Sequence, residues 1–203
     1  MSAPESRVMV EPRSPLAGVL RAGRHGAPGG DPVTIAEVPT AVVQLTARKG
    51  RAADVTAGVS RAIGLDLPAP GKAAAGRDQA AIWIQPDTWL LTAPRGIEGD
   101  FAAAVKRAVG DAGSVVDQTH GKTVLSLAGR QARRIMGKGC RLDLDPPVFG
   151  AGHSAVTQVA HIGCVLHQRD ATPAYTLIVP SSLAEAFYEW LTHSADELGY
   201  EVA

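Results

Sequence analysis

The chain has 203 residues and a mass of 21.0 kDa, with 45% hydrophobic and 20% charged side chains. This composition is typical of a globular protein with one large domain or two smaller halves. Basic and acidic residues balance at 20 each, without the basic excess of nucleic-acid-binding domains. Two cysteines are too few for a disulfide framework, and no apolar run could cross a bilayer. We therefore expect a cytoplasmic protein that binds neither nucleic acid nor membrane.

Residues 1–32 are predicted to form an irregular N-terminal arm. They contain five prolines and five glycines and show no lasting hydrophobic periodicity. Leu16, Val19 and Leu20 lie in the one apolar patch of this segment. Two interpretations stay open: a disordered tail, or an arm that becomes ordered on a partner with these three side chains as anchors. The folded domain is expected to span residues 33–203.

The first part of that domain predicts a β-α-β-β-α-β order. Apolar and polar residues alternate over 43–47, which indicates a half-buried strand. Apolar residues then recur at helical spacing over 55–63, and Gly64 follows as a helix cap. Residues 82–92 predict a hairpin that turns at Pro86-Asp87. A second helix is expected over 101–108, followed by a short strand at 115–116.

The same order is predicted again in the second part. Residues 123–127 alternate as a strand, and 129–136 predict a short helix. One long strand is expected over 155–167, with a return strand over 175–179. The last helix begins with an expected capping box at residues 182–185 and continues to Gly199.

Short sequence matches support a duplication. Residues 64–68 (Gly-Leu-Asp-Leu-Pro) end the first strand-helix unit, and residues 141–146 (Arg-Leu-Asp-Leu-Asp-Pro) end the second. A proline and a phenylalanine are also seven residues apart at both later helices. We therefore predict an α+β fold of two packed ferredoxin-like βαββαβ halves, at about 33–120 and 121–203.

Phosphate and dinucleotide motifs in this chain are incomplete. Residues 121–123 (Gly-Lys-Thr) match the end of a P-loop, but a strand is expected after them instead of the required helix. Residues 150–155 fit G-x-G-x-x-A, but they precede a strand and follow two prolines. Both segments are interpreted as turns, and no nucleotide or flavin site is predicted on this chain.

The candidate metal and acid-base groups also have ordinary explanations. His161, Cys164 and His167 would alternate on one long strand, so they could not converge on one ion. Asp117 with His120, and Asp143 with Asp145, lie in segments where turns account for the acidic residues. We predict no catalytic residue and no metal ligand.

Trp83 and Trp89 flank the predicted hairpin turn. If Ile82 and Ile84 face the core, Trp83 points outward, and an outward tryptophan on a strand is a good interface anchor. The alternative is a rim residue covered by the loop 68–79. Trp83 and Trp89 therefore join Leu16, Val19 and Leu20 as interface candidates.

Four segments together resemble the sarcosine oxidase gamma subunit family. They are residues 83–91 (Trp-Ile-Gln-Pro-Asp-Thr-Trp-Leu-Leu), 116–122 (Val-Asp-Gln-Thr-His-Gly-Lys), 138–144 (Lys-Gly-Cys-Arg-Leu-Asp-Leu) and the C-terminal helix from Pro180. The family is similar in fold to the glycine-cleavage T-protein and its folate-binding relatives. Folate chemistry is not transferred to Cys140, because the match to the relatives' Lys-Gly-Cys motif ends after three residues.

The resemblance implies a non-catalytic gamma subunit in a heterotetramer with alpha, beta and delta chains. Such a complex oxidatively demethylates sarcosine to glycine with formation of hydrogen peroxide. With tetrahydrofolate present, the methyl carbon leaves as 5,10-methylenetetrahydrofolate. The resemblance places FAD, FMN, NAD and tetrahydrofolate on the partner subunits, and it implies that the main contact is with alpha.

Two alternatives stay open from the sequence. The chain could be the equivalent subunit of an N-methylglutamate-type dehydrogenase. It could also be a stand-alone folate-dependent aminomethyltransferase-like protein, although it is short for a complete T-protein.

Overall fold

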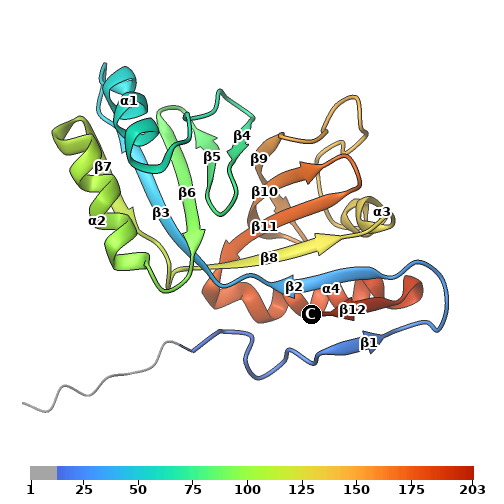
Figure 1. Ribbon diagram of the computed structural model, residues 1–203. Coiled ribbons are helices and arrows are strands. Elements are labelled where there is room, and N and C mark those ends of the chain that lie inside the picture. Colours follow the sequence, from blue (N-terminus) through green and yellow to red (C-terminus); the bar gives the residue numbers. More distant parts are fainter. Residues whose placement is uncertain (1–12) are drawn as a thin grey trace, which may run out of the picture.

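The computed structural model describes residues 13–203, which form two β-sheets and four α-helices (Figure 1). The five-stranded sheet contains, in spatial order, β4 (Ala73–Ala75), β5 (Ala80–Gln85), β6 (Thr88–Pro94), β3 (Thr40–Ala47) and β7 (Gly113–Asp117). The seven-stranded sheet contains β1 (Gly23–His25), β12 (Tyr200–Val202), β2 (Val33–Glu37), β8 (Lys122–Ala128), β11 (Ala174–Pro180), β10 (Ile162–Asp170) and β9 (Ser154–Val159).

Helices connect the strands of each sheet. The α-helices are α1 (Ala52–Ile63), α2 (Glu98–Val109), α3 (Ala132–Gly137) and α4 (Ala184–Ala195). Three short 3-10 helices are η1 (Gly110–Ala112), η2 (Ser181–Leu183) and η3 (Asp196–Leu198). The mixed α+β class predicted from the sequence is confirmed.

The two sheets repeat one topology. The order β4-β5-β6-β3-β7 has its counterpart in β9-β10-β11-β8-β12, with β2 inserted between β8 and β12. In the first half, α1 follows β3 and α2 follows the β5–β6 hairpin. In the second half, α3 follows β8 and α4 follows the β10–β11 hairpin. This topology supports the predicted duplication. It also places β2 in the seven-stranded sheet, although the predicted first half began at residue 33.

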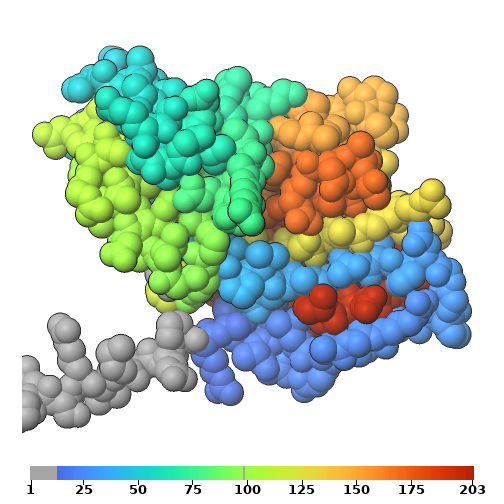
Figure 2. All heavy atoms as spheres, in the orientation of Figure 1, coloured from blue at the N-terminus to red at the C-terminus, as the bar shows by residue number. Residues whose placement is uncertain are grey.

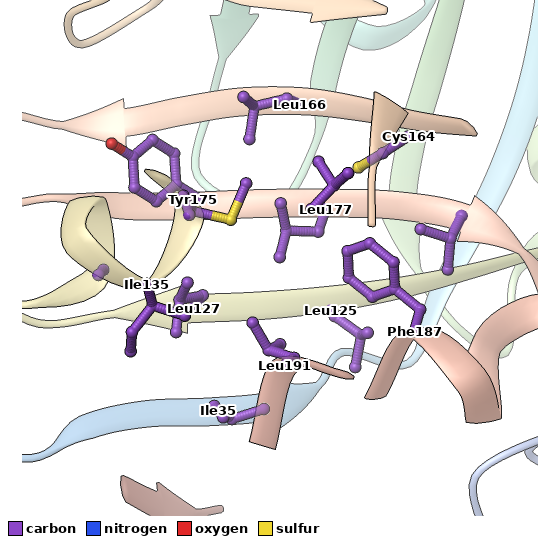
Figure 3. Close-up of a cluster of buried hydrophobic side chains, with 14 of the residues drawn as sticks. Ile35, Leu125, Leu127, Ile135, Cys164, Leu166, Tyr175, Leu177, Phe187 and Leu191 are labelled. Atoms are coloured by element: carbon purple, nitrogen blue, oxygen red, sulfur yellow. The ribbon is translucent and has the colours of Figure 1, made fainter. Parts of the chain in front are cut away.

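Three apolar cores separate four layers. The largest lies between the seven-stranded sheet and α3 and α4, and Figure 3 shows its side chains, including Tyr175, Phe187 and Leu191. A second core lies between the five-stranded sheet and α1 and α2. A smaller third core joins the two sheets through residues such as Val42 and Val124. The order of layers is therefore helix, sheet, sheet, helix.

Both faces of the central strands are buried. On β3, Val43 and Leu45 face the helices, whereas Val42 between them faces the other sheet. All three are fully buried. Because side chains alternate along a strand, two buried faces give a nearly continuous apolar run, as in 41–43.

The predicted single strand over 155–167 is wrong. It is two strands, β9 and β10, paired antiparallel around a tight turn at Ala160 and His161. Both turn residues have left-handed backbones, with φ of 50° and 65°. Such turns usually contain asparagine or glycine. Because alanine and histidine are not typical turn residues, the sequence of the two strands was interpreted as one continuous strand.

The predicted capping box is also not formed. Residues 181–183 are already a 3-10 turn, and α4 begins at Ala184 with Leu183 before it and no side-chain cap. The Ser182 and Glu185 pattern therefore lies on the entry turn instead of spanning the first helical turn. The helix itself was correctly predicted, and Gly199 with φ of 73° follows η3.

The described part of the arm is folded onto its own chain. Residues 23–25 form β1, an edge strand paired with β12, and His25 stacks on Tyr200 with ring centroids 5.3 Å apart. Figure 2 shows this blue segment against the red C-terminal residues. Leu16 is fully buried in the largest core, and Val19 and Leu20 pack against it. Apart from β1, the described residues 13–32 are turns, bends and irregular segments, and they pack on their own chain; residues 1–12 lie outside the described part.

Candidate functional site

The two tryptophans proposed as interface anchors belong to the core beneath α1 and α2. Trp89 is only 7% exposed, and its indole Nε1–H donates to the Pro68 carbonyl oxygen at 3.0 Å. Trp83 lies opposite Trp89 in the hairpin and packs against the same core, half-buried. The outward orientation expected for Trp83 assumed that only one face of the strand is covered. Ile82 instead faces the other sheet, so both faces are covered.

Leu16, unlike the half-buried Trp83, has no exposed surface in this chain. It is fully buried, and the carbonyl oxygen of Leu16 accepts from the N–H groups of Val19 and Leu20 at 2.9 Å each. The arm is apolar here because it completes the core of its own chain. Val19 and Leu20 remain half-buried, so part of each side chain stays accessible.

The three histidine and cysteine residues considered as metal ligands point into different surroundings. His161 is exposed in the β9–β10 turn, Cys164 lies in the largest core, and His167 faces the space between the sheets. Burial raises the pKa of Cys164 to about 12. Burial, with a smaller contribution from the Arg169 charge, lowers the pKa of His167 to about 4. Within residues 13–203 no three His, Cys, Asp or Glu side chains are grouped to hold a metal ion.

The two acidic pairs form local turns. The Asp117 carboxylate accepts from the N–H of Thr119 at 2.9 Å, and the Asp143 carboxylate accepts from the N–H of Asp145 at 2.9 Å. Short acidic side chains commonly bond their own backbone two residues on. Both pairs therefore have the turn role that the sequence favoured.

The Lys-Gly-Cys segment fastens α3 to α4. The Lys138 ammonium donates to the Ser194 carbonyl oxygen at 2.6 Å and lies 2.9 Å from a Glu197 carboxylate oxygen. A Cβ on Gly139 would lie 2.6 Å from the Trp190 ring, so only glycine fits without movement. This segment has a packing role, and burial raises the pKa of the Cys140 thiol.

Sequence reasoning missed a cleft at the junction of the two halves. The junction cleft has a volume of about 420 Å³ and is formed by four connections and the arm. The connections join β2 to β3, β6 to α2, β7 to β8, and β11 to η2. Its lining residues are Arg13, Ser14, Pro15, Glu37, Val38, Pro39, Thr40, Arg95, Gly96, Thr119, His120, Lys122, Thr123, Val124 and Ser181.

Positive charge dominates this cleft. Arg13, Arg95 and Lys122 line it, against one carboxylate, Glu37, which accepts from the Ser14 hydroxyl. The Arg95 guanidinium donates to Nδ1 of His120 at 3.2 Å. Because guanidinium has no acceptor, Nδ1 must carry the lone pair, and the hydrogen of a neutral ring is on Nε2.

The loop that carries His120 is held rigidly between the halves. The Thr119 side chain is buried, and its hydroxyl oxygen accepts from the Val42 N–H at 3.0 Å. The Gln118 N–H donates to the Val42 carbonyl oxygen at 2.8 Å, and the Ser181 N–H donates to the Gly121 carbonyl oxygen at 3.0 Å. The segment 116–122 noted in the sequence is thus a fixed crossover between the sheets.

Comparison with known proteins decides the family. The model of the sarcosine oxidase gamma subunit family matches residues 49–197. The chain is 31% identical over 192 residues to a sarcosine oxidase subunit gamma from Corynebacterium sp. strain P-1, covering 93% of this chain and 92% of that protein. The chain belongs to the sarcosine oxidase gamma subunit family. A second gamma subunit, from Arthrobacter sp., is 30% identical over 168 residues and is covered over 81% of both chains.

Solved structures agree with this assignment. A chain of the heterotetrameric sarcosine oxidase from Corynebacterium sp. U-96, in complex with pyrrole 2-carboxylate, superposes with a TM-score of 0.79 at 29% identity. The match covers 92% of this gamma-family chain and 96% of that chain. Aminomethyltransferase T of the glycine cleavage system from Bartonella henselae shares the fold, with a TM-score of 0.63 at 15% identity. The match covers 86% of this chain and 48% of the transferase.

These findings confirm the expected family and fold. The relatives favour neither alternative, because the similar curated proteins are named gamma subunits and the transferase is matched over less than half its length. No helix among residues 13–203 is both long and apolar enough to cross a bilayer.

Proposed function

We propose that this chain is the gamma subunit of a cytoplasmic heterotetrameric sarcosine oxidase and supplies no catalytic residue. Its partners are alpha, beta and delta chains, and its main contact is with alpha. FAD, FMN, NAD and tetrahydrofolate are bound by the partners. The complex demethylates sarcosine to glycine with formation of hydrogen peroxide, and with tetrahydrofolate it yields 5,10-methylenetetrahydrofolate.

One observation carries this proposal: almost the whole chain, 92% of it, matches almost the whole length, 96%, of a chain from a heterotetrameric sarcosine oxidase. A similarity that extends over nearly the whole of both chains supports the same place in a complex for this chain. The described hydrogen bonds also give the conspicuous motifs packing and turn roles, as shown for Lys138 and Asp117.

Affinity purification of the tagged chain from its native host tests the proposal. We expect three further polypeptides and bound flavin to co-purify, and the purified complex to release hydrogen peroxide from sarcosine. The isolated chain, expressed alone, should be colourless and inactive toward sarcosine. Purification of the chain without flavin-containing partners, or flavin bound by the isolated chain, would contradict the proposal.

A further inference from the structure

The junction cleft has the composition of a docking site. Three of its four charged side chains are cations, Arg13, Arg95 and Lys122, although the whole chain has a net charge of 0. Positive charge is therefore concentrated in the junction cleft. Among residues 13–203, the Lys122 ammonium makes no ion pair and donates no hydrogen bond. A half-buried cation without a partner favours a nearby negative charge.

Exposed apolar residues lie in, or directly beside in sequence, the segments that line the cleft. Val38 lines the cleft and is 40% exposed, a high value for a valine between two strands. Ile97 directly follows the lining residue Gly96 and is 44% exposed, and Leu183 lies two residues after the lining residue Ser181 and is 43% exposed. A small free anion gains nothing from apolar neighbours, whereas a polypeptide segment buries them.

The cleft is also preorganised. The Thr119 and Gln118 bonds to Val42 and the Ser181 bond to Gly121 fix its walls before any ligand arrives. Binding to a rigid surface costs little ordering entropy. The Thr123 hydroxyl donates to the Ser181 hydroxyl oxygen at 3.2 Å, so the Ser181 hydroxyl, which lines the same space, keeps its own hydrogen for a carboxylate oxygen.

We propose that the junction cleft docks an acidic segment of a partner subunit, whose carboxylates lie against Lys122 and the Arg95–His120 pair. Apolar side chains of the same segment then cover Val38 and its neighbours. This inference rests on the proposed function, because it assigns a surface of this chain to the assembly. The repeated topology explains the position of the cleft, since both chain connections that pass between the sheets, from β2 to β3 and from β7 to β8, line it.

Charge reversal at Lys122 tests the inference. We expect Lys122→Glu to weaken recovery of the partners by about tenfold or more at low salt, because attraction becomes repulsion. Raising the salt concentration should narrow the difference from wild type. Lys49→Glu is the matched control, since Lys49 is exposed beyond the opposite end of β3, and it should recover partners as wild type does. Far-UV circular dichroism and thermal melting verify that both variants fold.

A photo-crosslinking residue in place of Val38 identifies the occupant. A crosslink to a segment of another subunit that contains aspartate or glutamate supports the inference. A crosslink to residues 1–12 of the same chain, to a partner segment without acidic residues, or to nothing overturns it. If wild type recovers partners and Lys122→Glu recovers them equally, the cleft is not the docking site and the proposed function stands. If wild type recovers no partner, both proposals fail.

Discussion

His167 is a buried histidine that faces the space between the two sheets. The residue is 4% exposed, and it shares a cavity wall with the charged residues Arg169, Arg77 and Asp78. Burial, and secondarily Arg169, lowers its pKa to about 4 in the folded state, whereas the unfolded chain keeps a value near 6.5. The unfolded state therefore binds more protons between these values. The resulting stability is complete above pH 6.5 and is lost as the pH falls toward 4.

The pH dependence of unfolding checks this effect. Replacing His167 with glutamine removes the titrating group. Between pH 7 and pH 4.5 the free energy of unfolding of this variant should therefore fall by about 2 kcal/mol less than that of the wild type. Urea denaturation at the two pH values measures it. Thr176→Ser is the control, because Thr176 pairs with His167 across β10 and β11 and lines the same cavity but carries no titrating group, so this variant should keep the wild-type pH dependence. Equal pH slopes for wild type and His167→Gln would contradict the prediction.

Gly137 ends α3 and Gly139 lies in the turn that follows, and the two have very different surroundings. A methyl group on Gly139 would lie 2.6 Å from the Trp190 ring and 3.2 Å from the Ala160 backbone nitrogen, whereas one on Gly137 meets nothing within 4 Å. We expect Gly139→Ala to reduce stability by about 1–3 kcal/mol, since α4 must move. Gly137→Ala, at the end of α3, should be neutral or stabilising by less than about 1 kcal/mol. Denaturant midpoints of both variants measure this, and equal effects would show that α3 and α4 are not closely packed.

The arm is the element whose role differs most from its sequence. Because Leu16 is fully buried in the largest core, Leu16→Ala should destabilise the isolated chain by about 2–5 kcal/mol. Thermal and urea unfolding of the chain without partners measures it. Val148→Ala is the control, since Val148 is 57% exposed and its truncation should cost less than about 0.5 kcal/mol. A Leu16→Ala chain that unfolds like wild type, but recovers fewer partners, would support the anchor interpretation instead.

At the scale of elements, periodicity located the long helices and hairpins but not the shortest strands. The apolar spacing over 55–63 and the turn at Pro86-Asp87 correspond to α1 and to the β5–β6 hairpin. β1 and β12 have three residues each, too few for a pattern, and they exist because they pair with each other and with β2. The β9–β10 turn was missed because neither alanine nor histidine is among the residue types that usually mark a turn, although Ala160 and His161 both have left-handed backbones.

At the scale of the whole molecule, the family could be recognised from the sequence, but the junction cleft could not. Its charged residues Arg13, Glu37, Arg95 and Lys122 come from segments far apart in the chain. Only the crossing of the chain between the two sheets brings them together. The segment 116–122 was noticed as a motif, yet its position opposite Arg95 depends on tertiary structure that no local pattern encodes.

The two sheets are also joined away from the cleft, at their β4 and β9 edges. The Ser154 hydroxyl shares its one hydrogen between the carbonyl oxygens of Lys72 at 2.8 Å and Trp83 at 3.2 Å, and the Ser154 N–H donates to the Gly71 carbonyl oxygen at 2.9 Å. With the crossovers and the third core, this contact ties the halves at both ends. The halves should therefore unfold as one cooperative unit.

Two probes distinguish one transition from two. In a Trp190→Phe background, fluorescence reports only Trp83 and Trp89 of the five-stranded half, while far-UV circular dichroism reports the whole chain. Both signals should give the same urea midpoint. Ser154→Ala should lower the free energy of unfolding by about 1 kcal/mol, because the carbonyl oxygens of Lys72 and Trp83 lose a donor. The urea midpoints from fluorescence and from circular dichroism should fall by the same amount. If the fluorescence transition separates from the circular dichroism transition in the Trp190→Phe background itself, the halves are independent units and the edge contact does not couple them.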